Sequence, residues 1–170
     1  MPDDGTNHDA AFTDFVRTRQ VALIRFAWLG SGGSRAQAED LVQEALTRLY
    51  GRWSRVDDPE AYTRTTIARL NISVWRKLRR ERLHDTPVER AAMDERLEAL
   101  GPDAALVRAV RALPARQRLA IVLRYWCDDD DARIAETLGC AEATVRSTVR
   151  RGLLRLRERW PHDSMTGSQP

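Results

Sequence analysis

The most constraining feature of the chain is a helical apolar pattern that is interrupted once, at Gly139. Residues 132–138 carry apolar side chains on one helical face, and after the interruption apolar residues recur every three or four positions from Val145 to Trp160. Glycine can adopt the left-handed conformation that ends many helices. The pattern therefore predicts two helices joined by a tight turn, with the second beginning near Ala141.

The second of these helices is strongly basic. Residues 142–160 contain six arginines against two glutamates, a net charge of plus four. The apolar stripe is expected to face the domain interior, leaving Glu142, Arg146, Ser147, Arg150 and Arg151 outside. A helix-turn-helix with so basic a second helix is typical of DNA binding, with arginines on phosphates and short side chains at base edges. The alternative is a solvated helix in a bundle, although a helix selected only for solubility mixes its charges.

The rest of the chain also shows helical spacing, and it lacks the alternating β-branched runs that predict strands. Residues 64–82 hold seven basic side chains and one acid, whereas residues 83–103 hold six acids and two arginines. We therefore expect an all-α protein of two small helical domains, each with a basic surface for nucleic acid, joined by an acidic linker.

Composition and apolar spacing set the expected boundaries. We expect disordered tails at residues 1–11 and 161–170, helical domains over 12–80 and 105–160, and a linker over 81–104 that includes a short helix near 88–100. Helices in the first domain are predicted at 12–29, 35–50 and 59–80. The last has Asp58 as its N-cap, followed by a first-turn proline and an acid that the helix dipole favours.

Composition also argues against several classes of protein. Cys127 and Cys140 lack the spacing of a zinc site or a disulfide framework, and the four adjacent aspartates at 128–131 lack the spaced ligands and glycine of a calcium loop. The three histidines lie in the expected tails and linker, and no glycine-rich phosphate loop is present. We expect no metal, no cofactor and no enzymatic activity.

No signal peptide or membrane-spanning run is expected. The N-terminal residues are polar and acidic, and the longest apolar-rich segment, residues 21–29, is interrupted by Arg25. We therefore expect a soluble cytoplasmic protein.

Five motifs occur in the order seen in bacterial extracytoplasmic-function (ECF) sigma factors. They are AEDLVQEALTRL at 38–49, PEAY at 59–62, WRKLRR at 75–80, LPARQR at 113–118, and the helix-turn-helix residues from 134 to 147. The chain resembles this family over residues 12–160, and within it the SigE-type group common in actinobacteria. The resemblance implies a transcription initiation factor without an active site, with sigma region 2 over 12–80 and region 4 over 105–160.

The resemblance also implies partners. The helix over 35–50 would dock on the clamp-helix coiled coil of the RNA polymerase β′ subunit through an acidic ridge, which suits a basic partner helix. The ridge residues are Glu39, Asp40, Gln43 and Glu44. Taken alone, this helix favours the simpler interpretation, in which the ridge is a surface selected for helix solubility. The other implied partners are the β flap, promoter DNA and an anti-sigma factor, and the free chain would be a monomer.

The family reads and opens the promoter minus-10 element with the basic end of its third helix. The matching positions here are Tyr62, Arg64, Arg69, Asn71, Trp75, Arg76, Lys77, Arg79 and Arg80. The basic side chains would hold the backbone, while Tyr62 and Trp75 would stack on unpaired bases. Trp75 fits the core equally well. Many members carry an asparagine where this chain has Arg69, which departs from the family pattern.

Region 4 of the family reads the minus-35 element with the second helix of the helix-turn-helix. Here the implied major-groove residues are Glu142, Ala143, Arg146, Ser147 and Arg150, with Thr144 and Arg151 nearer the phosphates. Ala141 stands where the family often has a capping serine, which costs about 1 kcal/mol of helix stability.

Three other functions compete with this interpretation. A stand-alone helix-turn-helix regulator would bind palindromic DNA as a dimer and would leave the acidic ridge without a role. A structural adaptor would bind polymerase without needing Arg146 and Arg150. An enzyme would need a catalytic constellation that the sequence does not contain.

Overall fold

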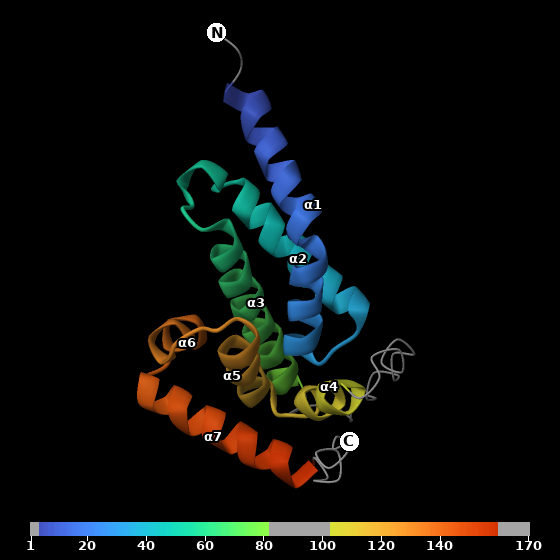
Figure 1. The fold of residues 1–170 in the computed structure, drawn as a ribbon, viewed down its shortest axis with the longest axis vertical. Helices are drawn as coiled ribbons and strands as arrows, with labels where there is room; N and C mark the ends of the chain where they lie inside the picture. Colours follow the sequence, from blue (N-terminus) through green and yellow to red (C-terminus); the bar gives the residue numbers. More distant parts are fainter. Residues whose placement is uncertain (1–3, 82–102, 160–170) are drawn as a thin grey trace, which may run out of the picture. The chain divides into compact units, whose positions relative to one another are not determined.

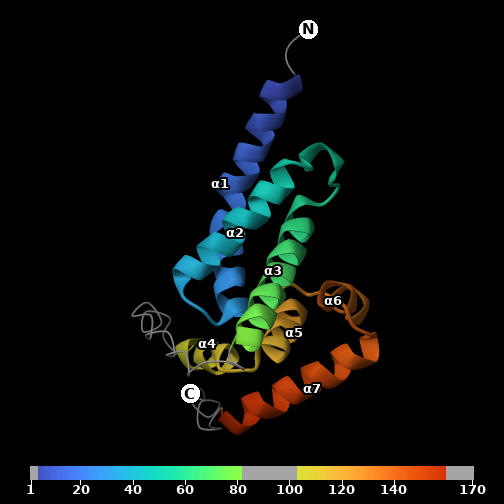
Figure 2. The same cartoon turned by 180° about the vertical axis from the view of Figure 1, so that it is seen from behind.

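The computed structural model describes residues 4–81 and 103–159, and within these ranges every regular element is a helix (Figure 1, Figure 2). The elements are α1 (Asp4–Ser31), α2 (Arg35–Tyr50), the short 3₁₀ helix η1 (Trp53–Arg55), α3 (Pro59–Glu81), α4 (Asp103–Arg111), α5 (Ala115–Trp126), α6 (Asp131–Leu138) and α7 (Glu142–Arg159). The all-α prediction is confirmed. Contacts between residues divide the chain into two units, with the boundary between Glu89 and Arg90. The helix expected near 88–100, Trp160 and the C-terminal tail lie outside the described residues.

The first unit is a bundle in which α1, α2 and α3 all pack against one another. Its core alternates large and small side chains: Phe26 and Leu49 are 2% and 0% exposed, and the alanines at 38, 45 and 68 are fully buried. Small side chains at these positions let the helix backbones approach closely. The Ser34 side chain accepts a hydrogen bond from the Gln37 backbone N–H, which caps the start of α2.

The start of α1 differs from expectation. α1 begins at Asp4, not at Phe12, so a disordered tail over residues 1–11 was wrong from Asp4 onward. The Tyr50 hydroxyl donates a hydrogen bond of 2.8 Å to Asp9, and the Phe12 ring lies 5.0 Å from the Tyr50 ring and 5.3 Å from the Trp53 ring. These anchors come from residues far along the chain, so the local composition of the N-terminal residues does not reveal them.

The start of α3 agrees with expectation. The Asp58 carboxylate accepts a hydrogen bond of 2.9 Å from the Ala61 N–H, and Pro59 is the first helical residue. Glu60 in the first turn pairs with Arg64 at 3.2 Å and with Arg19 of α1 at 3.3 Å. The cap therefore fixes where α3 begins, and the ion pairs connect its first turn to α1.

The second unit packs α5 against α7 and α6, with α4 in contact with α5 and α7. α4 begins at Asp103, inside the stretch expected as linker. Gly139 adopts φ 62° and ψ 50°, which confirms the predicted left-handed turn between α6 and α7. Gly152 allows a close helix crossing, because a Cβ at this position would lie 3.0 Å from the Ile121 side chain. The turn and the crossing together fix the direction of α7.

A buried arginine holds the turn between α4 and α5. Arg118 is 8% exposed, and its Nη1 donates hydrogen bonds of 2.8 Å to the backbone carbonyls of Arg111 and Leu113. Burial, and to a lesser degree the nearby charge of Arg111, lowers the pKa of Arg118 to about 10. The sequence did not single out this residue, since an arginine in a basic helix normally predicts exposure.

Replacing Arg118 by alanine is expected to lower the free energy of unfolding of the second unit by about 2–4 kcal/mol, because one buried and one part-buried carbonyl lose a charged donor and a cavity forms. Urea denaturation followed by circular dichroism measures the loss. Arg108→Ala, an exposed arginine on α4, is the matched control and should change stability by less than about 0.5 kcal/mol. Equal effects of the two substitutions would contradict a structural role for Arg118.

Candidate nucleic-acid and protein interfaces

All four residues of the predicted acidic ridge on α2 are exposed, opposite the buried Leu41, Ala45 and Leu49. Two of the carboxylates already have partners on the same helix. Arg35 Nε lies 2.6 Å from Glu39 and Arg48 Nε lies 2.8 Å from Glu44. Among the described residues Asp40 forms no ion pair, so it is the ridge carboxylate with the least compensated charge.

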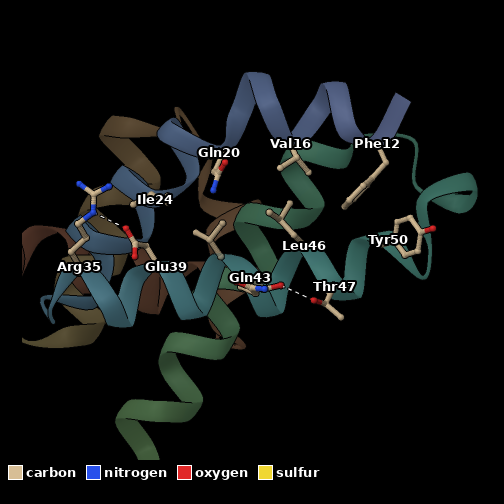
Figure 3. Close-up of a pocket in the computed structure, with 11 residues that line it drawn as sticks. Phe12, Val16, Gln20, Ile24, Arg35, Glu39, Gln43, Leu46, Thr47 and Tyr50 are labelled. Carbon is tan, nitrogen blue, oxygen red and sulfur yellow. Dashed lines mark hydrogen bonds and ion pairs between the residues drawn. The ribbon is translucent and has the colours of Figure 1, made fainter. Parts of the chain in front are cut away.

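The ridge borders a groove between α1 and α2, with a volume of about 680 Å³. Figure 3 shows Phe12 and Val16 of α1 facing Leu46 of α2, with polar side chains along the α2 edge. Glu39 and Gln43 line the groove, whereas Asp40 and Glu44 do not. The four predicted residues therefore lie along two edges of α2. The edge with Glu39 and Gln43 borders a groove that is lined by both apolar and polar side chains, and the other edge carries Asp40 and Glu44. The residues that complete the groove, which the sequence did not indicate, are Phe12, Val16, Gln20, Ile24, Arg35, Val42, Leu46, Thr47 and Tyr50.

The C-terminal half of α3 carries the first basic surface. Arg69, Arg76, Lys77, Arg79 and Arg80 are exposed. Trp75 is half-buried, with the Arg79 guanidinium 5.4 Å from the centre of its ring. Arg64 is only part-exposed and is paired with Glu60 at 3.2 Å.

Asn71 does not belong to this exposed surface. It is 4% exposed and lies one turn from Ile67 and Ala68, which are 1% and 0% exposed. Helical periodicity places these three residues on the face of α3 that packs into the bundle. The side-chain nitrogen Nδ2 of Asn71 has no hydrogen-bond partner among the described residues. The expectation that Asn71 contacts DNA is therefore corrected, because its amide lies in the protein core.

Tyr62 lies between two small pockets beside the segment that joins α2 and α3. One pocket has a volume of about 550 Å³ and includes Arg52, Tyr62 and Arg69, and the other, of about 510 Å³, includes Arg52, Arg55 and Tyr62. Arg52 and Arg55, which lie on either side of Trp53 between the helices, were not predicted from the sequence. An aromatic ring among arginines is a combination suited to a nucleotide, with stacking for the base and charge for the phosphate.

The second basic surface lies on α7. All seven predicted minus-35 residues are exposed: Glu142, Ala143, Thr144, Arg146, Ser147, Arg150 and Arg151. Arg146 Nη1 lies 3.3 Å from an Asp131 carboxylate oxygen and 3.7 Å from Glu142. Asp131 also pairs with Arg124 of α5.

The apolar stripe of α7 is covered only in its N-terminal half. Val145 and Val149 are 0% and 8% exposed, but Leu153 and Leu154 are 36% and 47% exposed. With Leu106 of α4 these leucines line a groove of about 1070 Å³. Arg146 and Arg150 line the same groove, so these two exposed arginines lie beside the apolar stripe and not on the opposite face of the helix. Positions 146 and 150 lie only 60° and 100° around the helix from position 149.

Residues 4–81 and 103–159 contain no group of three histidine, cysteine or acidic side chains that could hold a metal ion. They also contain no helix long and apolar enough to cross a membrane.

The two structural units correspond to two sequence families. Residues 15–81 match sigma-70 region 2, and residues 103–156 match sigma-70 region 4. A protein with both regions and these exposed basic helices is a transcription initiation factor of the sigma-70 class.

Individual relatives narrow the class. The chain is 35% identical over 150 residues to the RNA polymerase sigma-E factor of Streptomyces coelicolor, covering 86% of this chain and 84% of that protein. It is 32% identical over 145 residues to the ECF RNA polymerase sigma factor SigL of Mycobacterium tuberculosis, covering 81% of each. The fold resembles RpoE of Bartonella quintana, solved in complex with the anti-sigma factor NepR, with a TM-score of 0.64, 25% identity and coverage of 88% and 96% of the two chains. The chain belongs to the ECF sigma factors, which direct RNA polymerase to promoters.

The burial of Asn71 leads to a prediction about base selection. Asn71→Ala is expected to leave the minus-10 preference of the holoenzyme unchanged, while it lowers the free energy of unfolding by about 1–2 kcal/mol. Arg69→Ala, two residues away and exposed beside Tyr62, is the matched comparison and should weaken promoter binding without loss of stability. Selection from a library of minus-10 sequences measures the preference. A changed base profile for Asn71→Ala would contradict its assignment to the core.

Proposed function

We propose that this sigma factor divides its contacts among three surfaces: the α1–α2 groove for core polymerase, the α3 end with the Tyr62 pockets for the opened minus-10 strand, and α7 for the minus-35 duplex. The observation that carries the proposal is the exposure of every predicted recognition residue of α7, directly after the left-handed turn at Gly139. An exposed basic second helix of this kind is what a major groove accommodates.

The groove between α1 and α2 suits a partner helix. Its apolar floor includes Val16, Ile24 and Leu46, and its polar edge includes Glu39 and Gln43. Amphipathic helices dock into grooves of this composition, with apolar residues at the centre and polar residues at the rim. The clamp helices of the β′ subunit, the partner implied by the family, are the proposed occupant. Asp40 would attract a basic residue of that coiled coil.

The pockets beside Tyr62 suit an unpaired nucleotide of the opened promoter. Tyr62 offers a ring for stacking, and Arg52, Arg55 and Arg69 surround it with positive charge. The exposed end of α3 continues this charge along the strand. We assign backbone contacts there to Arg76, Lys77, Arg79 and Arg80, with Trp75 at the edge of the surface.

The groove at Leu106, Leu153 and Leu154 is apolar at its centre and has arginines at its rim. Exposed apolar patches with a polar rim mark surfaces that bind other proteins, so we propose the β flap as its partner. An anti-sigma factor is a further proposed partner, by analogy with the Bartonella protein that was solved with one. We also propose that the free protein is a monomer that binds promoter duplex weakly, since polymerase must hold the two units at a fixed separation for both to engage one promoter.

Transcription in vitro tests the proposal as a whole. Purified core polymerase with this chain should start transcription at a limited set of sites on genomic DNA, which mapping of the RNA 5′ ends would identify. Core polymerase alone is the control. Specific binding of the free chain to palindromic DNA as a dimer, without such start sites, would favour the stand-alone regulator instead.

Charge reversal on α2 tests the docking surface. Replacing both Asp40 and Glu44 by arginine should weaken co-purification with core polymerase at least tenfold, because the double substitution replaces attraction by repulsion at a charged interface. Circular dichroism should remain that of the unaltered protein, since both side chains are exposed.

The matched control is Asp14→Arg, which reverses an exposed carboxylate that is paired with Arg17 and lies on α1, not on the α2 ridge. It should leave co-purification unchanged. If the α2 double variant still co-purifies like the unaltered protein, the docking assignment is wrong.

A further inference from the structure

One carboxylate in the second unit connects three helices. Asp131, the first residue of α6, pairs through one oxygen with Arg124 of α5 and through the other with Arg146 of α7, at 3.3 Å. The Asp131 side chain is 22% exposed, whereas that of Arg146 is 59% exposed. The carboxylate is therefore held within the protein, and Arg146 extends from it towards the solvent.

The contacts of Arg146 leave half of its guanidinium available. Within the described residues, both of its ion pairs, to Asp131 and to Glu142, run through Nη1. A guanidinium is planar and has five N–H donors, so the edge formed by Nε and Nη2 remains free to donate two parallel hydrogen bonds. In the major groove, guanine presents two neighbouring acceptors, O6 and N7, that match such an edge.

We propose that Asp131 is a positioning residue for promoter reading: it holds Arg146 so that the free guanidinium edge meets a guanine of the minus-35 element. The inference rests on the proposed function of α7. Arg124 fixes Asp131 from the side of α5, so the contacts run from half-buried Arg124 through Asp131 to exposed Arg146 on α7. Asp131 does not itself contact DNA, because a carboxylate near phosphates is repelled.

The exposed fractions of Asp131 and Arg146 favour a role of Asp131 in positioning Arg146 over a role in stabilising the fold. An ion pair with a mostly exposed arginine contributes little to the free energy of folding. Its effect on recognition is larger, because an arginine held in one orientation loses less conformational freedom when it binds a base. The contact also distinguishes Arg146 from Arg150 and Arg151, for which no ion pair occurs among the described residues.

The experiment uses holoenzyme containing the full chain with Asp131→Asn, bound to a library of minus-35 sequences at two salt concentrations. Asparagine keeps the shape of the side chain and removes its charge. We expect preference for guanine at one position to fall about fivefold, the upper end of what a partly exposed ion pair supplies. Affinity for sequences without that guanine, and the salt dependence, should not fall. A uniform change across all sequences would overturn the positioning role.

The matched control is Asp129→Asn, which removes the same charge from the same acidic run but from a partner of Arg133, at 3.6 Å. It should leave the base profile unchanged. In an Arg146→Ala background, Asp131→Asn should have no further effect on that guanine, because the residue it positions is gone. An equal effect in both backgrounds would show that Asp131 acts elsewhere, and would overturn the proposal.

Two results separate this inference from the proposed function. If the unaltered holoenzyme shows no base preference upstream, α7 does not read the minus-35 element and both fail. If it shows preference and folded Asp131→Asn retains all of it, only the positioning role fails. Should Asp131→Asn not fold, Asp131→Glu keeps the charge and displaces the carboxylate, and it must reduce preference at the same single position. An unchanged profile for that variant would overturn the inference.

Discussion

Close packing of helices through small side chains is the constraint on which both units depend. Ala38, Ala45 and Ala68 are fully buried at the helix contacts of the first unit, and Gly152 allows a close approach of α7 to α5 in the second. Because each core is small, each helix packs against its neighbours through one face and leaves another face exposed to partners. The exposed surfaces of this sigma factor are thus a direct result of how little of each helix the core uses.

Several parts of the fold could be predicted from the sequence because their signals are local. The cap at Asp58, the turn at Gly139 and the helical periodicity all involve residues within a few positions of one another. The N-terminal turns of α1 could not be predicted, since they depend on an aromatic contact with Tyr50. The burial of Arg118 was likewise not visible, because its partners are backbone carbonyls that carry no sequence signal.

The candidate site was predictable in its composition and less so in its geometry. Apolar spacing identified the stripe of α7 but could not indicate that Leu153 and Leu154 stay 36% and 47% exposed. Charge identified the ridge of α2 but not that Glu39 and Glu44 are neutralised by arginines of the same helix. The surface of α2 is therefore less acidic than a residue count indicates.

Phe12 connects the α1–α2 groove to the segment between α2 and α3. It lines the α1–α2 groove proposed for polymerase, and its ring contacts Trp53, the neighbour of Arg52 in the Tyr62 pockets. Because this one ring both lines the groove and packs on Trp53, a substitution that removes it would alter the groove lining and the packing of the segment between α2 and α3 together.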